Sequence, residues 1–233
     1  MRQIILDTET TGLDPAMGHR IIEVAAVEVI NRKITDRHFQ RYVNPEREID
    51  EGAKKVHGIT ELFLSDKPKF RDVLEDFLSF ISGAELIIHN APFDLSFLNQ
   101  ELQFCKRENI DSYINGVLDS LVMARELHPG KRNSLDALCD RYKIDNSKRS
   151  LHGALLDSRL LAECYLAMTR GQESLLISEV DNTAETDLSN AIERKPNLFV
   201  KRAERDELAL HERYLEDLSG EIKENCLWLK KNK

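Results

Sequence analysis

The sequence predicts an α/β fold, in which a mixed sheet flanked by helices is followed by a flexible linker and a helical tail. β-branched runs come first along the chain, and stretches with helical spacing of apolar residues then alternate with further strand-like runs. After residue 177 the sequence turns polar and acidic. Leucines later return at helical spacing. We therefore expect a domain at 1–177, a flexible acidic linker at 178–197 and a partner-binding tail at 198–233.

The N-terminal half supplies most of the predicted sheet. Residues 2–7 form a first strand that is almost entirely apolar after its first two positions. The β-branched runs at 20–30 and 34–44 are joined by three residues, so antiparallel pairing in a hairpin is the natural choice. Residues 84–90 are a compact buried strand, and 115–127 are assigned to one more strand.

Helices are predicted between and after these strands. Apolar residues in 69–83 recur every three to four positions, and a glycine ends the pattern. The segment 92–108 begins with a proline, which the first turn of a helix tolerates. Two further helices are expected at 134–144 and 152–171. A sheet covered by helices on its faces is the architecture that this order favours.

Composition limits the classes of protein that need consideration. The chain has 233 residues, of which 41% are hydrophobic and 32% charged, as expected for a globular protein with a real core. No window approaches the roughly 18 apolar residues of a membrane span, and no signal peptide opens the chain. The four cysteines are scattered without a Cys-x-x-Cys pair, so we expect reduced thiols in a cytoplasm: Cys105, Cys139, Cys164 and Cys226.

The formal net charge of −8 argues against a long, tight grip on nucleic acid, since phosphate binding relies on lysine and arginine. Any nucleic-acid substrate would then be held locally or with the help of a partner. Six basic residues near the motifs could contact phosphates, and a solvated loop explains them equally well: Lys54, Lys55, Lys131, Arg132, Lys148 and Arg149.

Four acids and one histidine lie where α/β folds build their sites. Asp7 and Glu9 are two apart at the end of the first strand, so both side chains point to one face. Asp94 follows the strand 84–90, and Asp157 lies on a predicted helix with His152 five residues ahead. Taken alone, an Asp-x-Glu pair also fits a solvated strand end or a helix cap. Together, the acids suit two divalent cations held about 4 Å apart, an arrangement used in phosphodiester chemistry.

Roles follow from the chemistry of that reaction. We assign one ion to Asp7, Glu9 and Asp157, where it would activate the attacking water, and a second to Asp7 and Asp94, where it would stabilise the departing oxygen. Mg²⁺ or Mn²⁺ would suit these oxygen ligands. His152 is the general base in this scheme, because a histidine side chain can take up a proton near neutral pH.

Three stretches, LDTETTGL, HNAPFDLSFL and LHGALLDSRLLAECYL, resemble in order and spacing the motifs of the DEDD exonuclease superfamily, in its histidine branch. More narrowly, VHGIT, PGKRNSLDALCDRY, IDNSKRSLHGALLD and CLWL resemble the family of proofreading exonuclease subunits of bacterial DNA polymerase III. The resemblance is dense over roughly residues 1–172 and looser over the tail.

The resemblance implies a ribonuclease H-like fold and 3′→5′ removal of nucleotides from DNA primer ends. It also implies the metal and general-base roles given above for the four acids and His152. Many relatives carry a glutamate at the position of Gly52, so the resemblance carries no glutamate contact with substrate over to this residue. Besides Asp7, Glu9 and Asp157, the predicted substrate contacts are Thr10, Thr11, Gly12, Leu13 and His57.

Partner contacts are predicted beyond the domain. The peptide QESLLI resembles sequences that dock on the bacterial sliding clamp, through Gln172, Leu175, Leu176 and Ile177. The tail carries the single tryptophan of the chain and is predicted to bind the polymerase alpha subunit, although a helix packed back on the domain is the alternative. A small theta-like subunit is a further expected partner of the domain. Two other functions stay open: a free-standing RNA-trimming exoribonuclease, and a structural subunit whose nuclease site is inert.

Overall fold

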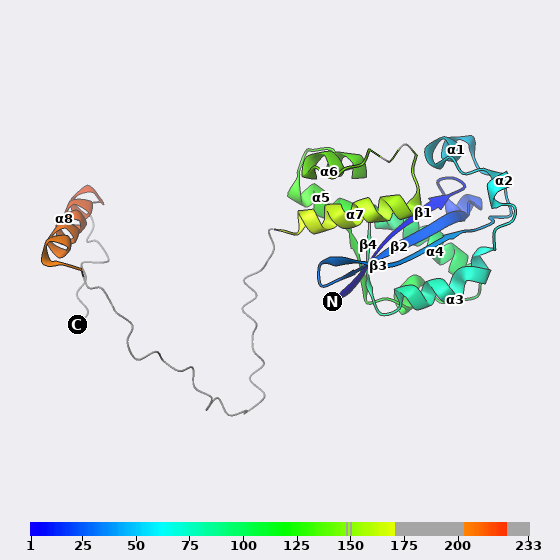
Figure 1. The fold of residues 1–233 in the computed structure, drawn as a ribbon, viewed down its shortest axis with the longest axis horizontal. Coiled ribbons are helices and arrows are strands. Elements are labelled where there is room, and N and C mark those ends of the chain that lie inside the picture. The colour runs from blue at the N-terminus through cyan, green and yellow to red at the C-terminus, as the bar shows by residue number, and fades with distance from the viewer. Residues whose placement is uncertain (148, 150, 171–202, 223–233) are drawn as a thin grey trace, which may run out of the picture. The chain divides into compact units, whose positions relative to one another are not determined.

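The structure, a computed structural model, describes residues 1–147, 149, 151–170 and 203–222. The chain divides into two units, Met1–Ile177 and Ser178–Lys233. The first unit is an α/β domain in which helices flank a mixed five-stranded sheet, as the sequence predicts (Figure 1).

The strand order in the sheet is β3-β2-β1-β4-β5. The strands are β1 (Arg2–Thr10), β2 (Ile21–Ile30), β3 (Lys33–Tyr42), β4 (Glu85–Ile88) and β5 (Gly116–Asp119). β1 pairs with β2 in antiparallel fashion, β2 does the same with β3, and β1, β4 and β5 run parallel. The predicted hairpin is confirmed. Because β1, β4 and β5 run in one direction, their carboxyl ends meet at one edge of the sheet.

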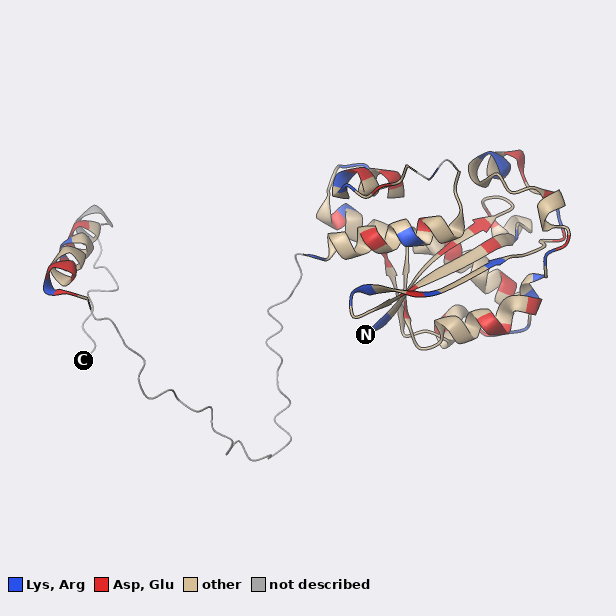
Figure 2. Ribbon diagram, in the orientation of Figure 1, with Lys and Arg blue, Asp and Glu red and all other residues tan. Residues whose placement is uncertain are grey.

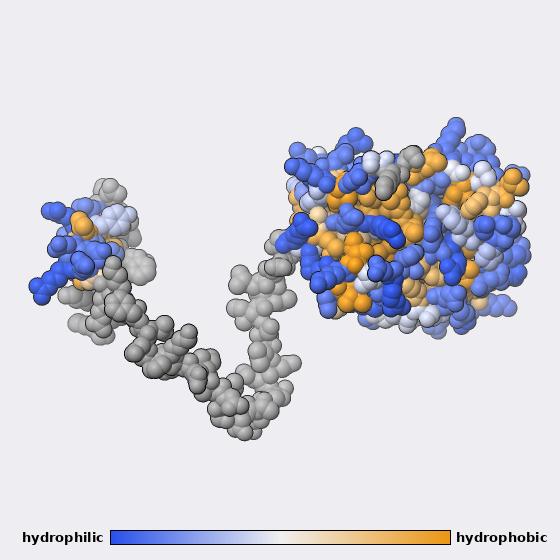
Figure 3. All heavy atoms as spheres, viewed as in Figure 1, coloured by the Kyte–Doolittle hydropathy of each residue, from blue (hydrophilic) through white to orange (hydrophobic). Residues whose placement is uncertain are grey.

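Helices cover both faces of this sheet (Figure 1). They are α1 (Glu51–His57), α2 (Glu61–Leu64), α3 (Phe70–Ile81), α4 (Ala91–Phe104), α5 (Ser120–Leu127), α6 (Leu135–Tyr142) and α7 (Ala154–Met168), with short 3₁₀ turns at Pro15–Met17 and Ile110–Ser112. Phe77 of α3 and Phe97 of α4 pack with Leu6 in the main core. On the other face, Leu161 and Tyr165 of α7 pack on Ile5. Figure 3 shows apolar residues gathered around α7 on an otherwise largely hydrophilic face.

The structure differs from the prediction at three places along the chain. The strand assigned to 115–127 ends at Asp119, and α5 begins there because the Asp119 carboxylate caps it, accepting from the Leu121 and Val122 amides. α1 and α2 were not predicted, since seven and four residues are too few for a helical period to stand out. β1 also runs to Thr10, three residues beyond the predicted strand.

The second unit contains α8 (Arg205–Ile222), where the leucine spacing of the tail predicts a helix. Leu208, Leu210 and Tyr214 of α8 are exposed. The clamp-like peptide, the predicted linker and the tryptophan segment lie outside the described residues. Among the helices that the structure describes, none is both long and apolar enough to cross a bilayer.

Candidate active site

β1 turns both of its carboxylates toward α7. Ile5, Asp7 and Glu9 are spaced two residues apart on β1, so their side chains share one face of the strand. The Ile5 side chain packs on α7. Glu9 lies directly opposite Glu23 of β2, and a β-bulge follows between Glu9 and Thr10. Figure 2 marks acidic residues on these central strands, which are otherwise largely uncharged.

Asp94 reaches the same edge of the sheet from α4. The chain leaves β4, passes through Asn90 in the left-handed region (φ 69°) and enters α4 one residue later. The Asp119 carboxylate accepts from the Asn90 and Ala91 amides, at 3.1 and 3.2 Å, and so joins the end of β5 to the start of α4. In the first turn of α4, the buried Asp94 accepts from the Thr8 hydroxyl at 2.6 Å.

Asp157 and His152 complete the cluster from the start of α7. One ligand atom each of Glu9, His152 and Asp157 lies within 4.8 Å of the other two. Asp157 is buried, whereas the His152 side chain is 44% exposed. The backbone N–H of His152 donates to the Val56 carbonyl of α1 at 3.1 Å, which ties this segment across the site.

Burial and repulsion between carboxylates raise the pKa values of Asp7, Glu9 and Asp94. Burial, followed by the charges of Asp94, Glu9 and Asp157, raises the pKa of Asp7 well above its usual range. Burial and then the charge of Asp157 raise the pKa of Glu9 to about 8. Burial raises the pKa of Asp94 to about 7, although its bond from Thr8 opposes the shift. Protons or positive charges beside the carboxylates must therefore offset the charge of this cluster near neutral pH.

The cluster fits divalent cations on its own chemistry. Carboxylate oxygens are the ligands that Mg²⁺ and Mn²⁺ prefer, and crowded carboxylates are stabilised when such an ion joins them. Glu9 and Asp157 are close enough to share an ion, with His152 at the same point. Asp7 on β1 lies near enough to Glu9, Asp94 and Asp157 for their negative charges to raise its pKa.

A pocket of about 520 Å³ opens beside the carboxylates, within the size range of small-molecule sites. Its lining is Thr8, Glu9, Thr10, Gly12, Leu13, Asp50, Gly52, Ala53, Val56, His57 and Phe93. The Leu13 side chain is 84% exposed at its edge. At Gly52 a Cβ atom would meet open space, so a glutamate would fit there sterically. The lining combines apolar side chains with a few polar groups, as small-molecule sites usually do.

His57 presents one donor toward this pocket. Its Nδ1 accepts from the Ile59 amide at 2.9 Å, which places the ring proton on Nε2. Nε2 is buried and has no hydrogen-bond partner among the described residues. Burial lowers the pKa of His57, although a backbone contact with Thr10 opposes the shift, so the neutral ring is favoured.

The packing of the loop after β1 requires the glycine of the LDTETTGL motif, Gly12. A Cβ on Gly12 would lie 2.3 Å from the His19 ring, so only glycine fits. Thr11 holds this loop in shape: its backbone N–H donates to the Arg20 carbonyl at 2.9 Å and its side chain is fully buried. That N–H is therefore not offered to a substrate, because the loop uses it to hold its own shape.

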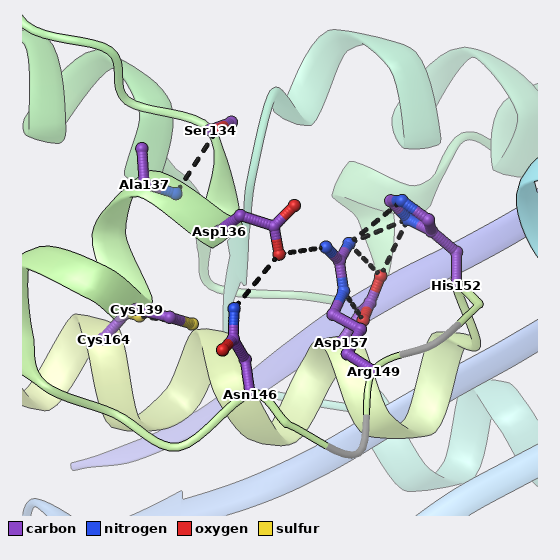
Figure 4. A network of polar contacts seen from close by, with 9 residues as sticks. All are labelled: Ser134, Asp136, Ala137, Cys139, Asn146, Arg149, His152, Asp157 and Cys164. Atoms are coloured by element: carbon purple, nitrogen blue, oxygen red, sulfur yellow. Dashed lines mark hydrogen bonds and ion pairs between the residues drawn. The ribbon is translucent and has the colours of Figure 1, made fainter.

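The sequence prediction missed Glu23 and left Arg149 undecided. Glu23 is 1% exposed and accepts from the Ala154 amide at 3.1 Å, at the first residue of α7. The sequence signal for this role was the position of Glu23 inside the otherwise largely apolar run of β2. Arg149 does not lie in a solvated loop, since its side chain is 6% exposed and contacts Asp157 and His152 (Figure 4).

Comparison with known proteins agrees with this geometry. Residues 4–165 match the Exonuclease (RNase T) family. The DNA polymerase III subunit epsilon of Salmonella typhimurium is 49% identical to this chain, over 97% of each sequence. The subunit epsilon of Escherichia coli is 48% identical over the same shares.

The chain belongs to the exonuclease family, among the DNA polymerase III epsilon subunits. A solved structure titled Exonuclease X in complex with 5′ overhanging duplex DNA is 29% identical. It aligns with a TM-score of 0.58 over 73% of this chain and 92% of that one. The ribonuclease H-like fold that the motifs imply is thus confirmed for this chain.

Proposed function

We propose that this chain is the proofreading subunit of DNA polymerase III and removes mismatched nucleotides from primer 3′ ends by 3′→5′ hydrolysis. The observation that carries this proposal is the meeting of Glu9, His152 and Asp157 within 4.8 Å, beside a pocket of nucleoside size. Membership of the epsilon-subunit family supports DNA as the substrate.

In this proposal the pocket holds the last nucleotide of the primer. The exposed Leu13 lies against its base, and the free Nε2–H of His57 donates to an oxygen of its sugar. Thr10 shapes the pocket, since its hydroxyl donates to the Gly12 carbonyl at 2.6 Å. The scissile phosphate then lies over the carboxylates at the end of β1.

Asp7, Glu9, Asp94 and Asp157 would hold two Mg²⁺ or Mn²⁺ ions. Such ions, when bound, activate water and stabilise the charge on the departing 3′ oxygen. His152 takes the proton from the attacking water, and its 44% exposure leaves the ring accessible from solvent. Oδ2 of Asp157 lies 3.1 Å from Nδ1 of that ring, where it would accept a hydrogen bond once the ring has taken up the proton.

Preference for mismatched ends follows from the size of the pocket. A single nucleotide must leave its template to enter, and unpairing costs less when the base is already mismatched. Selection therefore occurs at the unpairing step, and the carboxylates need not read the base.

The partners proposed are the alpha subunit at the tail, the sliding clamp at QESLLI and a small theta-like subunit on the domain, in the bacterial cytoplasm at replicating DNA. Exposed Leu208, Leu210 and Tyr214 of α8 support a protein partner for the tail. Tethering would raise the local concentration of DNA for a chain whose net charge is −8.

The test is digestion of a mismatched DNA primer, a matched primer and single-stranded RNA by the full chain with Mg²⁺. Asp7→Ala is the inactive variant, and Asp76→Ala, an exposed acid on α3, is the matched control. The proposal predicts fastest loss of the mismatched end, abolished only in Asp7→Ala. Preference for RNA would indicate an RNA-trimming enzyme, and equal rates for Asp7→Ala and wild type would refute the site.

A further inference from the structure

The Arg149 guanidinium binds both carboxylate oxygens of Asp157 (Figure 4). Its Nε donates to Oδ1 of Asp157 at 2.6 Å and its Nη2 donates to Oδ2 at 2.8 Å. Both side chains are nearly buried, at 6% and 5% exposure. This two-bond contact between a guanidinium and a carboxylate is among the strongest polar contacts that side chains make.

The same guanidinium also contacts the His152 ring. Nη2 of Arg149 lies 2.8 Å from Nδ1 of His152. Because a guanidinium can only donate, Nδ1 is the acceptor and the ring proton is on Nε2. The lone pair on Nδ1 is then the one with which His152 could take a proton, and Arg149 occupies it.

Arg149 also has a tether outside the cluster. Its Nη1 donates to Oδ1 of Asp136 on α6 at 2.5 Å, and the Asp136 side chain is 56% exposed. The charge of Arg149 reaches Glu9 as well, where it opposes the rise in pKa caused by the other acids. Arg149 therefore neutralises the point at which Glu9 and Asp157 would share an ion.

We propose that Arg149 is a positioning residue that competes with divalent cations for Asp157, and that it must leave both Asp157 and His152 before hydrolysis can occur. A divalent cation and a guanidinium repel each other across a few ångströms, so they cannot both lie against the same carboxylate at low cost. The Asp136 pair allows the guanidinium to turn away while it keeps one partner. Ion binding at Asp157 and release of the His152 lone pair are thereby coupled.

This inference rests on the proposed metal-dependent function and deepens it. If the form with Arg149 turned away is populated at about a tenth, the apparent affinity for the ion is reduced about tenfold. Removing the guanidinium removes that reduction. Arg149→Lys keeps the charge without the fork, and so relieves the competition only in part.

The experiment is a calorimetric titration of the full chain with Mn²⁺, without DNA. We expect the dissociation constant of Arg149→Ala to be about tenfold lower than that of the wild type. Arg149→Lys should fall between the two, whereas Asp136→Asn, which weakens the partner that the guanidinium keeps when it turns away, should give a constant no lower than that of the wild type. Arg159→Ala, an exposed arginine farther along α7, is the control for simple loss of positive charge, and should change the constant less than about twofold at physiological salt.

A second readout is the melting temperature of each variant in EDTA and in Mn²⁺. Without its partner, Asp157 is a buried charge, so Arg149→Ala should melt lower than wild type in EDTA and gain more from Mn²⁺. Equal or weaker Mn²⁺ binding by both Arg149 variants, or equal tightening in Arg159→Ala, would overturn the inference. Absence of Mn²⁺ binding in the wild type would instead overturn the proposed function.

Discussion

Replacement of Glu23 tests whether β2 positions the helix that carries His152 and Asp157. Glu23 is 1% exposed; its Oε2 accepts from the Ala154 amide at 3.1 Å, and its Oε1 accepts from the Gln40 side chain at 2.7 Å. Gly153 precedes α7 and has no side chain to cap the helix. Glu23 therefore supplies, from another strand, the acceptor that the first turn of α7 lacks.

Glu23→Ala removes both acceptors and leaves the buried Ala154 amide unsatisfied, whereas the part-buried Gln40 amide keeps the Tyr42 hydroxyl as a partner at 3.4 Å. With one buried donor unsatisfied, the loss in the free energy of unfolding is about 1–3 kcal/mol. Glu23→Gln keeps one oxygen for Ala154 and can be satisfied if the Gln40 amide turns over, so it should lose only about 1 kcal/mol.

Glu23→Ala should lower catalytic activity more than alanine substitution of an equally buried glutamate away from the site. A shift of about 1 Å in catalytic groups can reduce turnover about 100-fold, so we expect a kcat loss of about 10- to 100-fold for Glu23→Ala with little change in KM. Glu23→Gln should restore most of it. Glu28→Ala is the control, because Glu28 is also 1% exposed on β2 but bonds to Arg2 and Arg37, away from the site. Urea unfolding and steady-state digestion of a DNA primer measure both quantities. A kcat for Glu23→Ala within about twofold of that for Glu28→Ala would refute the positioning role.

Three further predictions concern the site itself. His152→Ala should lower kcat by about 100- to 10,000-fold while the Mn²⁺ dissociation constant stays within about threefold of wild type; a parallel loss of Mn²⁺ affinity would make His152 a ligand instead. The folded-state pKa values of Glu9 (about 8) and Asp94 (about 7) exceed ordinary values, so the folded chain binds more protons than the unfolded chain. In EDTA, stability should therefore fall as pH rises from about 5 to about 8, and Glu9→Gln should flatten this trend while Mn²⁺ binding by wild type strengthens with pH; a trend unchanged in Glu9→Gln would contradict it. Gly12→Ala should raise KM several-fold and cost about 1–3 kcal/mol, since the new Cβ meets the His19 ring; unchanged unfolding and KM would show that the loop yields.

Much of the fold could be predicted because its signals are local. Apolar spacing predicted the helix at Phe70–Ile81, and the short link predicted the hairpin of β2 and β3. α1 was not predictable, since seven residues carry less than two helical periods. The end of β5 was missed because the Asp119 cap is a polar signal inside an apolar run. Short elements are fixed by caps and tertiary contacts rather than by periodicity.

The site was predictable where motif spacing carries the chemistry, and not where it depends on tertiary contacts. Glu9, His152 and Asp157 meet as the ordered motifs imply. Arg149 was undecided, because its burial depends on Asp136 of another helix as well as on Asp157. Sequence spacing does not show which of several nearby cations reaches a carboxylate.

The most direct test of the carboxylate cluster is the number of Mn²⁺ ions bound by the full chain at neutral pH, measured by calorimetry with Asp7→Asn and Asp76→Asn beside wild type. The account predicts two ions for wild type and Asp76→Asn, and at least a tenfold loss of affinity for Asp7→Asn. Equal binding by Asp7→Asn and wild type would contradict it, because the acids of β1 would then have no part in holding the ions.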